Sequence, residues 1–243
     1  MRIFLRNRIR GRYENDKRLS KHNYGSRKGY SIDSALLEKR LIFDLAKRTE
    51  EVCSYTISDL EACYDRQLPK IGGVVEESVG VNREAFKLVT KGLHRSEHYI
   101  GTSHGISEHS YGGEDVVLGG TGQGNTLSGC VCRDVSCLMF KELENKRLGI
   151  VMKSKHNKNV VQRVVIAFVD DSDFCTKGNE CEKKMQEIVE YYTSMYEATG
   201  GKVQQEKVMM FSWIWKKNII VEVVINVTIN GEKVKCINVF HFF

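Results

Sequence analysis

Four aspartates lie where carboxylates could do chemistry. Asp59 and Asp65 follow one apolar, strand-like segment, and Asp170 and Asp171 follow another. Carboxylates beside apolar chain are partly shielded from water and need a counter-charge. A hard divalent cation such as Mg²⁺ supplies one, because it prefers oxygen ligands from one or two carboxylates and from substrate phosphates. Asp59 and Asp170 on neighbouring strands could form such a set, and the alternative is that the acidic pairs only build turns.

A glycine-rich stretch over residues 119–128 could bring its backbone close to a ligand. It does not match GxGxxG, because the third glycine comes one residue early, and no Lys-Ser/Thr pair follows its last glycine as in a P-loop. One polar side chain, Gln123, lies at the start of a predicted helix whose amide dipoles favour phosphate. The stretch therefore predicts close backbone approach to a ligand and does not by itself identify a nucleotide.

The first 31 residues carry most of the positive charge. They hold ten Lys and Arg residues against two acidic residues, a net charge of +8, so the other 212 residues together carry −2. Tyr13, Tyr24 and Tyr30 lie between these cations and could stack on bases. We interpret this segment as a contact surface for a phosphate backbone, with a solvated or flexible arm as the alternative.

Hydrophobic periodicity predicts the elements that must position these residues. Helices are expected over 31–51, 83–99, 125–146 and from Asn179 to Gly200, with Asn179 as N-cap and Glu182 completing a capping box. Strands are expected over 52–58 and 162–169, the second ending in an acidic turn over 170–173, and a hairpin over 104–118 around Gly112 and Gly113. The segment after Lys202 reads as strands, with a tight turn at Asn230 and Gly231. This order predicts an α+β chain with an antiparallel sheet backed by helices.

Composition sets the broad class of protein. With 243 residues, 41% hydrophobic and 28% charged, the chain is long and apolar enough for a sizeable core, which excludes disordered and collagen-like classes. The longest apolar stretch is broken by charged residues and no signal peptide is visible, so we expect a cytoplasmic or nuclear protein without membrane spans. The eight cysteines show no CxxC or zinc-finger spacing, which predicts reduced, mostly buried thiols.

Five segments together resemble the motifs of reverse transcriptases. Residues 59–65 (Asp-x4-Tyr-Asp) are similar to their first palm motif, 120–128 to the glycine–glutamine motif, 168–171 to the aromatic-x-Asp-Asp box, and 201–207 to the fourth motif, which ends in lysine. Upstream, 23–31 resembles the fingers segment of retroelement polymerases of the non-LTR and group II intron type. The five occur in the family's order and cover about residues 20 to 210, which makes the combined resemblance specific.

The resemblance implies a right-hand polymerase palm and RNA-directed DNA synthesis. An RNA template, a DNA primer and deoxynucleoside triphosphates would be its partners. Residues 1–50 would form a basic arm with partial fingers, and 51–243 a palm truncated at the primer grip. We expect no thumb, endonuclease or RNase H segment, and we expect this sequence to lack the fingers strands that precede the palm in the family.

The resemblance also assigns the catalytic residues. Asp59 and Asp170 would hold two Mg²⁺ ions, with Mn²⁺ as a possible substitute, while Asp171 assists and Leu60 offers its carbonyl. Paired ions suit this chemistry because in-line phosphoryl transfer develops charge on both the attacking and the leaving oxygen. Lys207 would lie near the triphosphate as a charge or proton donor, with a solvated strand lysine as the alternative.

Further positions follow for the substrate and the template. Tyr64 would lie against the sugar and reject ribonucleotides, and its alternative role is that of a core aromatic. Gln123 and Gly124 would line the nascent base pair. Arg27 and Lys28 would touch the template backbone.

Two other functions compete with this one. A catalytically inactive remnant of a reverse transcriptase would still bind nucleic acid through its basic arm. An RNA-dependent RNA polymerase would share the carboxylates, but Tyr64 and the fingers-like segment favour deoxynucleotides. Because a decayed gene copy would lose its acidic residues as readily as any others, the presence of Asp59, Asp170 and Asp171 argues that the parent sequence is competent.

Overall fold

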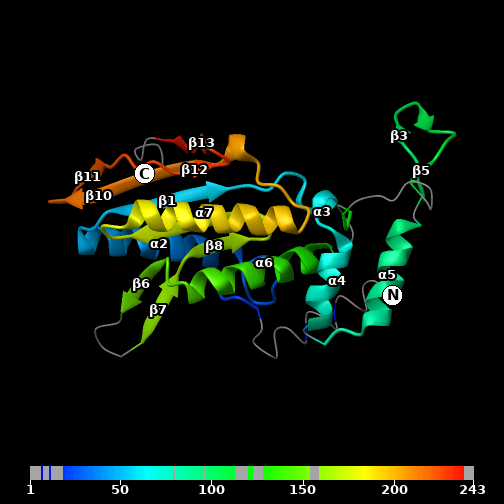
Figure 1. Cartoon of the computed structure of the whole chain (residues 1–243), viewed down its shortest axis with the longest axis horizontal. Helices are drawn as coiled ribbons and strands as arrows, with labels where there is room; N and C mark the ends of the chain where they lie inside the picture. The colour runs from blue at the N-terminus through cyan, green and yellow to red at the C-terminus, as the bar shows by residue number, and fades with distance from the viewer. Residues whose placement is uncertain are drawn as a thin grey trace.

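The computed structural model describes residues 7, 11, 19–78, 80–95, 97–112, 120–122, 128–153 and 159–237. Within these ranges the chain builds one large sheet with helices on both faces (Figure 1). The glycine-loop positions Gln123 and Gly124, the start of the basic arm with Tyr13, and the last six residues lie outside the described ranges.

The large sheet has β1 at its centre. Its strands are β1 (Cys53–Ser58), β8 (Val165–Phe168), β9 (Asp171–Lys177), β10 (Met209–Lys216), β11 (Ile219–Glu222) and β14 (Lys235–Cys236). The order is β11-β10-β1-β9-β8 with every pair antiparallel, and β14 joins β10 in parallel. The predicted strand over 52–58 and the predicted antiparallel sheet are confirmed.

Alternate residues of the strands face opposite helical layers. Tyr55, Cys175 and Phe211 share one buried cluster with residues of α2 (Ile32–Thr49), while Phe174 and Met210 share the other with residues of α6 (Ser128–Asn145) and α7 (Cys181–Ala198). Figure 1 shows α7 and α2 on opposite faces of the sheet. The period of two along each strand therefore builds two cores, one on each face.

Helix α2 agrees closely with the predicted helix over 31–51. Ser31 accepts a hydrogen bond from the Ser34 amide at its start, and Glu50 in left-handed conformation closes it with a bond to the Ala46 carbonyl. The end of α7 also agrees, because Gly200 with φ +84 follows its last turn. Its start does not: the N-cap is Glu180 without a side-chain hydrogen bond, so the predicted Asn179 capping box is wrong.

The strand predicted over 162–169 is interrupted. Val164 separates β7 (Val160–Arg163), which pairs with β6 (Ile150–Lys153), from β8 in the large sheet. The predicted acidic turn over 170–173 is also shorter than expected, because Asp171 already begins β9 and the turn lies at Val169 and Asp170. The interruption arises because one apolar run serves two different sheets.

In the described residues between β1 and α6, the chain forms three helices and two small two-stranded pairs. The helices are α3 (Cys63–Arg66), α4 (Pro69–Ser78) and α5 (Arg83–His94), and α5 shortens the helix predicted over 83–99. The small strands are β2 (Glu97–His98), β3 (Gly101–Thr102), β4 (Gly105–Ile106) and β5 (Tyr111–Gly112). The hairpin predicted around Gly112 is wrong, because β3 pairs with β4 and Gly112 pairs back to Glu97.

The tail contains the predicted tight turn. Asn230 and Gly231, with φ of +51 and +84, join β12 (Thr228–Ile229) to β13 (Glu232–Lys233). A short 3₁₀ helix, η1 (Gln205–Lys207), precedes β10. Helix α6 is described from Ser128, and its predicted start near 125 lies outside the described residues.

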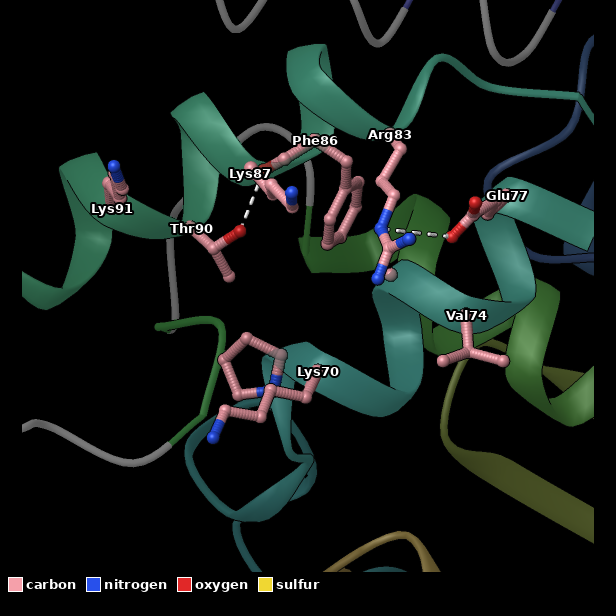
Figure 2. A pocket seen from close by; sticks show the side chains of 10 residues that line it. Lys70, Val74, Glu77, Arg83, Phe86, Lys87, Thr90 and Lys91 are labelled. Atoms are coloured by element: carbon pink, nitrogen blue, oxygen red, sulfur yellow. Dashed lines mark hydrogen bonds and ion pairs between the residues drawn. The ribbon is translucent and has the colours of Figure 1, made fainter.

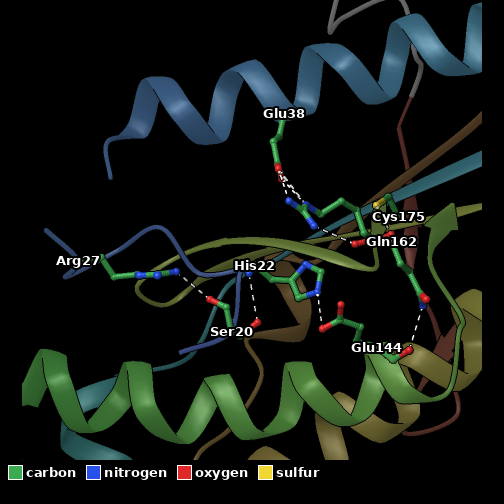
Figure 3. Close-up of polar contacts among 8 residues, drawn as sticks. Ser20, His22, Arg27, Glu38, Glu144, Gln162 and Cys175 are labelled. Atoms are coloured by element: carbon green, nitrogen blue, oxygen red, sulfur yellow. Dashed lines mark hydrogen bonds and ion pairs between the residues drawn. The ribbon is translucent and has the colours of Figure 1, made fainter. Parts of the chain in front are cut away.

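Residues 19–30 are built into the body of the molecule. His22 and Tyr24 hydrogen-bond the backbone of Ala167 in β8, each at 2.8 Å. In Figure 3, His22 lies with its Nε2 3.4 Å from Oε2 of Glu144 on α6. This segment therefore extends the edge of the large sheet beside β8.

A second polar link ties β7 to α2. The Arg163 guanidinium donates to both oxygens of Glu38 at 2.6 to 2.9 Å, and both side chains are largely buried. Burial and shared hydrogen bonds make such a bidentate pair a fixed point between two elements.

Seven of the eight cysteines are buried and Cys236 is exposed, as predicted for mostly buried thiols. No helix in the described ranges has the length and apolar character needed to cross a membrane.

Candidate functional site

The antiparallel register of β1 and β9 places two predicted carboxylates side by side. Ser58, the last residue of β1, is the partner of Ser172. The next residue of one strand and the preceding residue of the other are Asp59 and Asp171, so they meet at the end of this strand pair. Asp170 lies next to Asp171 in the turn between β8 and β9.

That turn has a strained backbone. Val169 adopts φ +64, a conformation that β-branched residues rarely enter. Asn23 supports it from the segment beside β8, because its Oδ1 accepts hydrogen bonds from the amides of Gly25 at 2.9 Å and Val169 at 3.4 Å. Only glycine fits at position 25, since a Cβ there would come 2.3 Å from the Val169 nitrogen. Strain held by surrounding contacts is typical of functional sites.

Lys207 reaches this acidic end from η1. Its ammonium lies 2.7 Å from Oδ2 of Asp59. Hydrogen bonds hold the two chains together nearby, from the Gln204 amide to the Asp59 carbonyl and from the Glu61 amide to the Lys202 carbonyl, each at 2.9 Å. They flank the bridge between Leu60, which is buried, and Val203, and so fix the approach of η1 to β1.

The charges at this end interact. Partial desolvation raises the pKa of Asp171, and the negative charges of Asp170 and Asp59 raise it further. The Asp59 carboxylate raises the pKa of Lys207 through its hydrogen bond. Three carboxylates and one ammonium therefore carry an excess of negative charge, which favours a cation here.

Tyr64 connects the acidic end to the glycine-rich loop. Its carbonyl accepts hydrogen bonds from the amides of Thr121 at 2.6 Å and Gly122 at 3.3 Å. Gly120 lies so close that a Cβ there would come 2.3 Å from the Asp65 carbonyl oxygen. Burial raises the pKa of the Tyr64 hydroxyl, with further contributions from Cys132 and the Asp170 charge. The structure thus brings three of the sequence segments together.

The basic residues of the fingers-like segment have different surroundings. Arg27 donates to the carbonyls of Ser20 and Asn23 and lies over the Tyr30 ring, so its guanidinium braces its own segment. Lys28 is exposed. Tyr24 is 5% exposed and cannot stack on a base, because it packs into the core beside α2. That part of the predicted stacking surface is wrong.

One cluster of polar residues beside the site was not predicted. Asp173 is buried, accepts a hydrogen bond from the Tyr55 hydroxyl at 3.0 Å and pairs with Lys39 of α2. Lys39 also partly offsets the raised pKa of Asp171. The alternation of Asp171 and Asp173 along a strand was the available signal, because it places both on one face.

The donor set suits Mg²⁺ chemically, because Asp59, Asp170 and Asp171 offer only oxygen ligands around an excess of negative charge. Within the described part of the chain, no three His, Cys, Asp or Glu side chains are arranged to hold a metal ion. The carboxylates would therefore have to converge on binding one, with Lys207 leaving Asp59.

Comparison by sequence yields no match to a family model or to a curated protein. Comparison by structure yields telomerases. Telomerase from Candida tropicalis, in complex with a TWJ fragment of telomeric RNA, matches with a TM-score of 0.58 at 15% identity over 87% of this chain and 33% of its own. Apo telomerase from the same species matches with 0.58 at 13% identity over 91% and 38%.

Telomerase from Candida albicans, also in complex with a TWJ fragment, matches with a TM-score of 0.55 at 13% identity over 90% of this chain and 34% of its own. This chain therefore spans little more than a third of the length of these three telomerases. At such low identity the likeness concerns the fold. The chain therefore has a fold that resembles part of these telomerases, and the likeness covers 87% to 91% of this chain.

Proposed function

We propose that this chain is the catalytic palm, with part of the fingers, of an enzyme that copies an RNA template into DNA. The observation that carries the proposal is the meeting of Asp59, Asp171 and Lys207 at one end of β1, β9 and η1. These residues come from three separate segments that resemble reverse transcriptase motifs, and the fold supports the same superfamily. The relation to non-LTR and group II intron enzymes stays part of the proposal and rests on residues 23–31.

Asp59, Asp170 and Asp171 would hold two Mg²⁺ ions, with the Leu60 carbonyl as a further ligand. When bound, the ions would supply the positive charge that the attacking and leaving oxygens of a nucleotidyl transfer require. Lys207 would turn from Asp59 toward the triphosphate and place its ammonium against the leaving phosphate charge.

The remaining assignments concern the reactants. Tyr64, which the structure ties to the glycine-rich loop, would pack against the sugar of a deoxynucleoside triphosphate. Gln123 and Gly124 would lie beside the nascent base pair. Lys28 would contact the template, whereas Arg27 would act by holding the shape of its segment.

Primer extension on an RNA template tests the proposal. The chain, alone and supplemented with a thumb-containing segment from a related polymerase, is incubated with primer, deoxynucleoside triphosphates and Mg²⁺. Asp59→Asn and Asp170→Asn are the test variants, and Asp44→Asn, an exposed aspartate on α2, is the control. We expect extension by the supplemented wild type and by Asp44→Asn, and at least a 10²-fold loss in the other two.

Extension that survives Asp170→Asn would overturn the assigned site. Absence of extension in all samples, together with salt-dependent binding of the primer–template, would favour the inactive nucleic-acid-binding remnant. Incorporation of ribonucleotides in preference to deoxynucleotides would favour an RNA-dependent RNA polymerase.

A further inference from the structure

A cavity of about 450 Å³ opens between α4 and α5, and none of the carboxylates at the end of β1 lines it. Figure 2 shows Phe86 of α5 pointing toward α4, with Val74 on α4 and Thr90 on α5 around the gap. Its volume lies in the usual range for small-molecule sites, and it exceeds the space that one planar base needs.

The inside of the cavity is apolar for identifiable reasons. Gly73 lets α5 approach, because a Cβ there would already touch the Phe86 ring at 3.0 Å. The Thr90 hydroxyl donates to the Phe86 carbonyl at 2.6 Å, so its hydrogen-bonding capacity is used within its own helix. Pro69 and Val74 complete the lining, and Val74 is 65% exposed. Contact with a flat apolar ligand would bury this exposed apolar surface, which favours binding.

The rim of the cavity is basic. Lys70, Arg83, Lys87 and Lys91 line it, against one carboxylate, Glu77. Arg83 lies 3.7 Å from Glu77, and Lys87 pairs with Glu84 at 2.8 Å.

The other two cations of the rim are available. Neither Lys70 nor Lys91 forms a salt bridge with any residue that the structure describes, and both are exposed. The positive charge around the rim lowers the pKa of the neighbouring Glu84. Lys87 makes the largest contribution, and Arg83 and Lys91 add to it. The rim therefore keeps a net positive charge after its internal pairs are formed.

We propose that this cavity between α4 and α5 is a binding site for single-stranded nucleic acid, with one base in the apolar gap and the flanking phosphates on Lys70 and Lys91. Phe86 is buried and forms the floor of the gap, so the apolar contact with a base would come from the exposed Val74. A basic rim around an apolar gap thus provides the two contacts that single strands use, phosphate neutralisation and base packing. An acidic peptide would satisfy the lysines alone. The inference deepens the proposed function, because a strand bound here would belong to the template or the primer.

The position of the cavity agrees with that assignment. In Figure 1, α4 and α5 lie at the end of the molecule toward which β1 runs. Helix α4 follows Asp59 along the chain after only the short α3, and the Leu68 amide at its start is fixed to the Thr199 carbonyl at 3.0 Å. A strand seated between α4 and α5 would thus be held near the acidic end without occupying it.

The test measures binding by fluorescence anisotropy in EDTA, so that neither metal binding nor catalysis contributes. The probes are a labelled oligo(dT) and the same oligonucleotide with abasic sites. The test variant is Lys70→Gln/Lys91→Gln. The matched control is Lys216→Gln/Lys217→Gln, which changes two exposed lysines, the last residue of β10 and the first of the turn after it. Val74→Ser removes apolar wall at an exposed position and should leave the fold intact.

We expect Lys70→Gln/Lys91→Gln to weaken oligo(dT) binding about tenfold and to flatten the plot of log K against log salt by about 1.4 units, since each phosphate contact on a single strand contributes about 0.7. The control should change neither quantity by more than about twofold. The wild type should bind the abasic oligonucleotide several-fold more weakly than oligo(dT). In the Val74→Ser variant the affinities for the two probes should be closer to each other.

Equal binding by the test and control variants would overturn the proposal, and so would equal affinity of the wild type for both probes. Competition by polyglutamate as strong as that by unlabelled oligo(dT) would assign the cavity to an acidic peptide instead. Because the assay contains no metal, its outcome is independent of whether Asp59 and Asp170 support synthesis.

Discussion

The Lys207 ammonium lies 2.7 Å from Oδ2 of Asp59, although 148 positions separate the two residues in the chain. In this arrangement the lysine occupies the space on Asp59 that a divalent cation would take. If Asp59 binds a metal ion as we propose, Lys207 would compete with that ion for the carboxylate.

The Lys207→Gln variant should bind Mn²⁺ more tightly, by about threefold to tenfold, because loss of one positive charge lowers the local potential. Electron paramagnetic resonance of free Mn²⁺ measures this directly. The Lys202→Gln variant is the control, since Lys202 is equally exposed and pairs with Glu61 at 3.1 Å instead of with Asp59. Unchanged or weaker Mn²⁺ binding by Lys207→Gln would contradict the competition.

Asp171 should make stability depend on pH. Desolvation and the charges of Asp170 and Asp59 raise its pKa in the folded protein above that of the unfolded chain, so the ionised carboxyl opposes folding and protonation relieves the cost. Asp171→Asn should therefore raise the free energy of unfolding at pH 7, by about half a kcal/mol because the site is partly exposed. This gain should disappear as the pH falls through the folded pKa.

Urea denaturation of wild type and variant at pH 7, 5 and 4 checks this dependence. The Asp44→Asn variant, on the exposed face of α2, should show no comparable gain at pH 7. A stabilisation by Asp171→Asn that is the same at all three pH values would exclude the electrostatic cause.

The close contact between Gly25 and Val169 should be sensitive to a single methyl group. Gly25→Ala would place its Cβ 2.3 Å from the Val169 nitrogen and 2.5 Å from Cγ2, which forces either the turn or the segment beside β8 to move. We expect a loss of about 2 kcal/mol in the free energy of unfolding. Gly101→Ala, where a Cβ meets nothing within 4 Å, should cost much less.

Chemical denaturation of both alanine variants provides the comparison. If Gly25→Ala and Gly101→Ala lost the same stability, the tight packing at the Asp170 turn would not be a structural requirement.

Breaking the Glu38 and Arg163 pair should be costly. Glu38→Ala leaves the Arg163 guanidinium, which is 12% exposed, without its bidentate partner, and we expect a loss of about 3 kcal/mol. Asp44→Ala removes an exposed pair on the same helix, with Arg40 at 3.5 Å, and should cost less than about 0.5 kcal/mol. Thermal unfolding followed by circular dichroism distinguishes the two. Similar unfolding temperatures for Glu38→Ala and Asp44→Ala would show that the buried Glu38–Arg163 pair stabilises the fold no more than the exposed pair.

Helices and turns whose capping, spacing and turn residues lie close together in the sequence were predicted correctly. Helix α2 has a capping serine and regular apolar spacing, and the turn at Asn230 and Gly231 has the residues that left-handed backbone demands. Helix α4 escaped prediction because Gly72 and Gly73 give it low helix propensity. Packing explains it, since a Cβ on Gly72 would come 2.4 Å from Val131 of α6, so only glycine allows these helices to approach.

In the candidate site, too, the sequence reveals single residues but not the contacts that depend on packing. Asp59, Asp170 and Asp171 stand out in the sequence because acidic residues end apolar runs. The pair of Lys39 with Asp173 does not, because it joins α2 to β9 across 134 positions and depends on how the sheet and the helix pack. The strain at Val169 is likewise invisible, since it arises from Asn23 and Gly25 holding the turn from another segment.

The central position of β1 has a consequence for biosynthesis. Both of its neighbours, β9 and β10, come more than 110 residues later in the chain, and the Tyr55 hydroxyl bonds Asp173 across 118 positions. A ribosome that has released β1 must therefore translate most of the remaining chain before the strand can pair. Such non-local topology folds slowly and leaves apolar edges open in the meantime. We expect the nascent protein to need chaperone protection, and its acidic end to be among the last features to form.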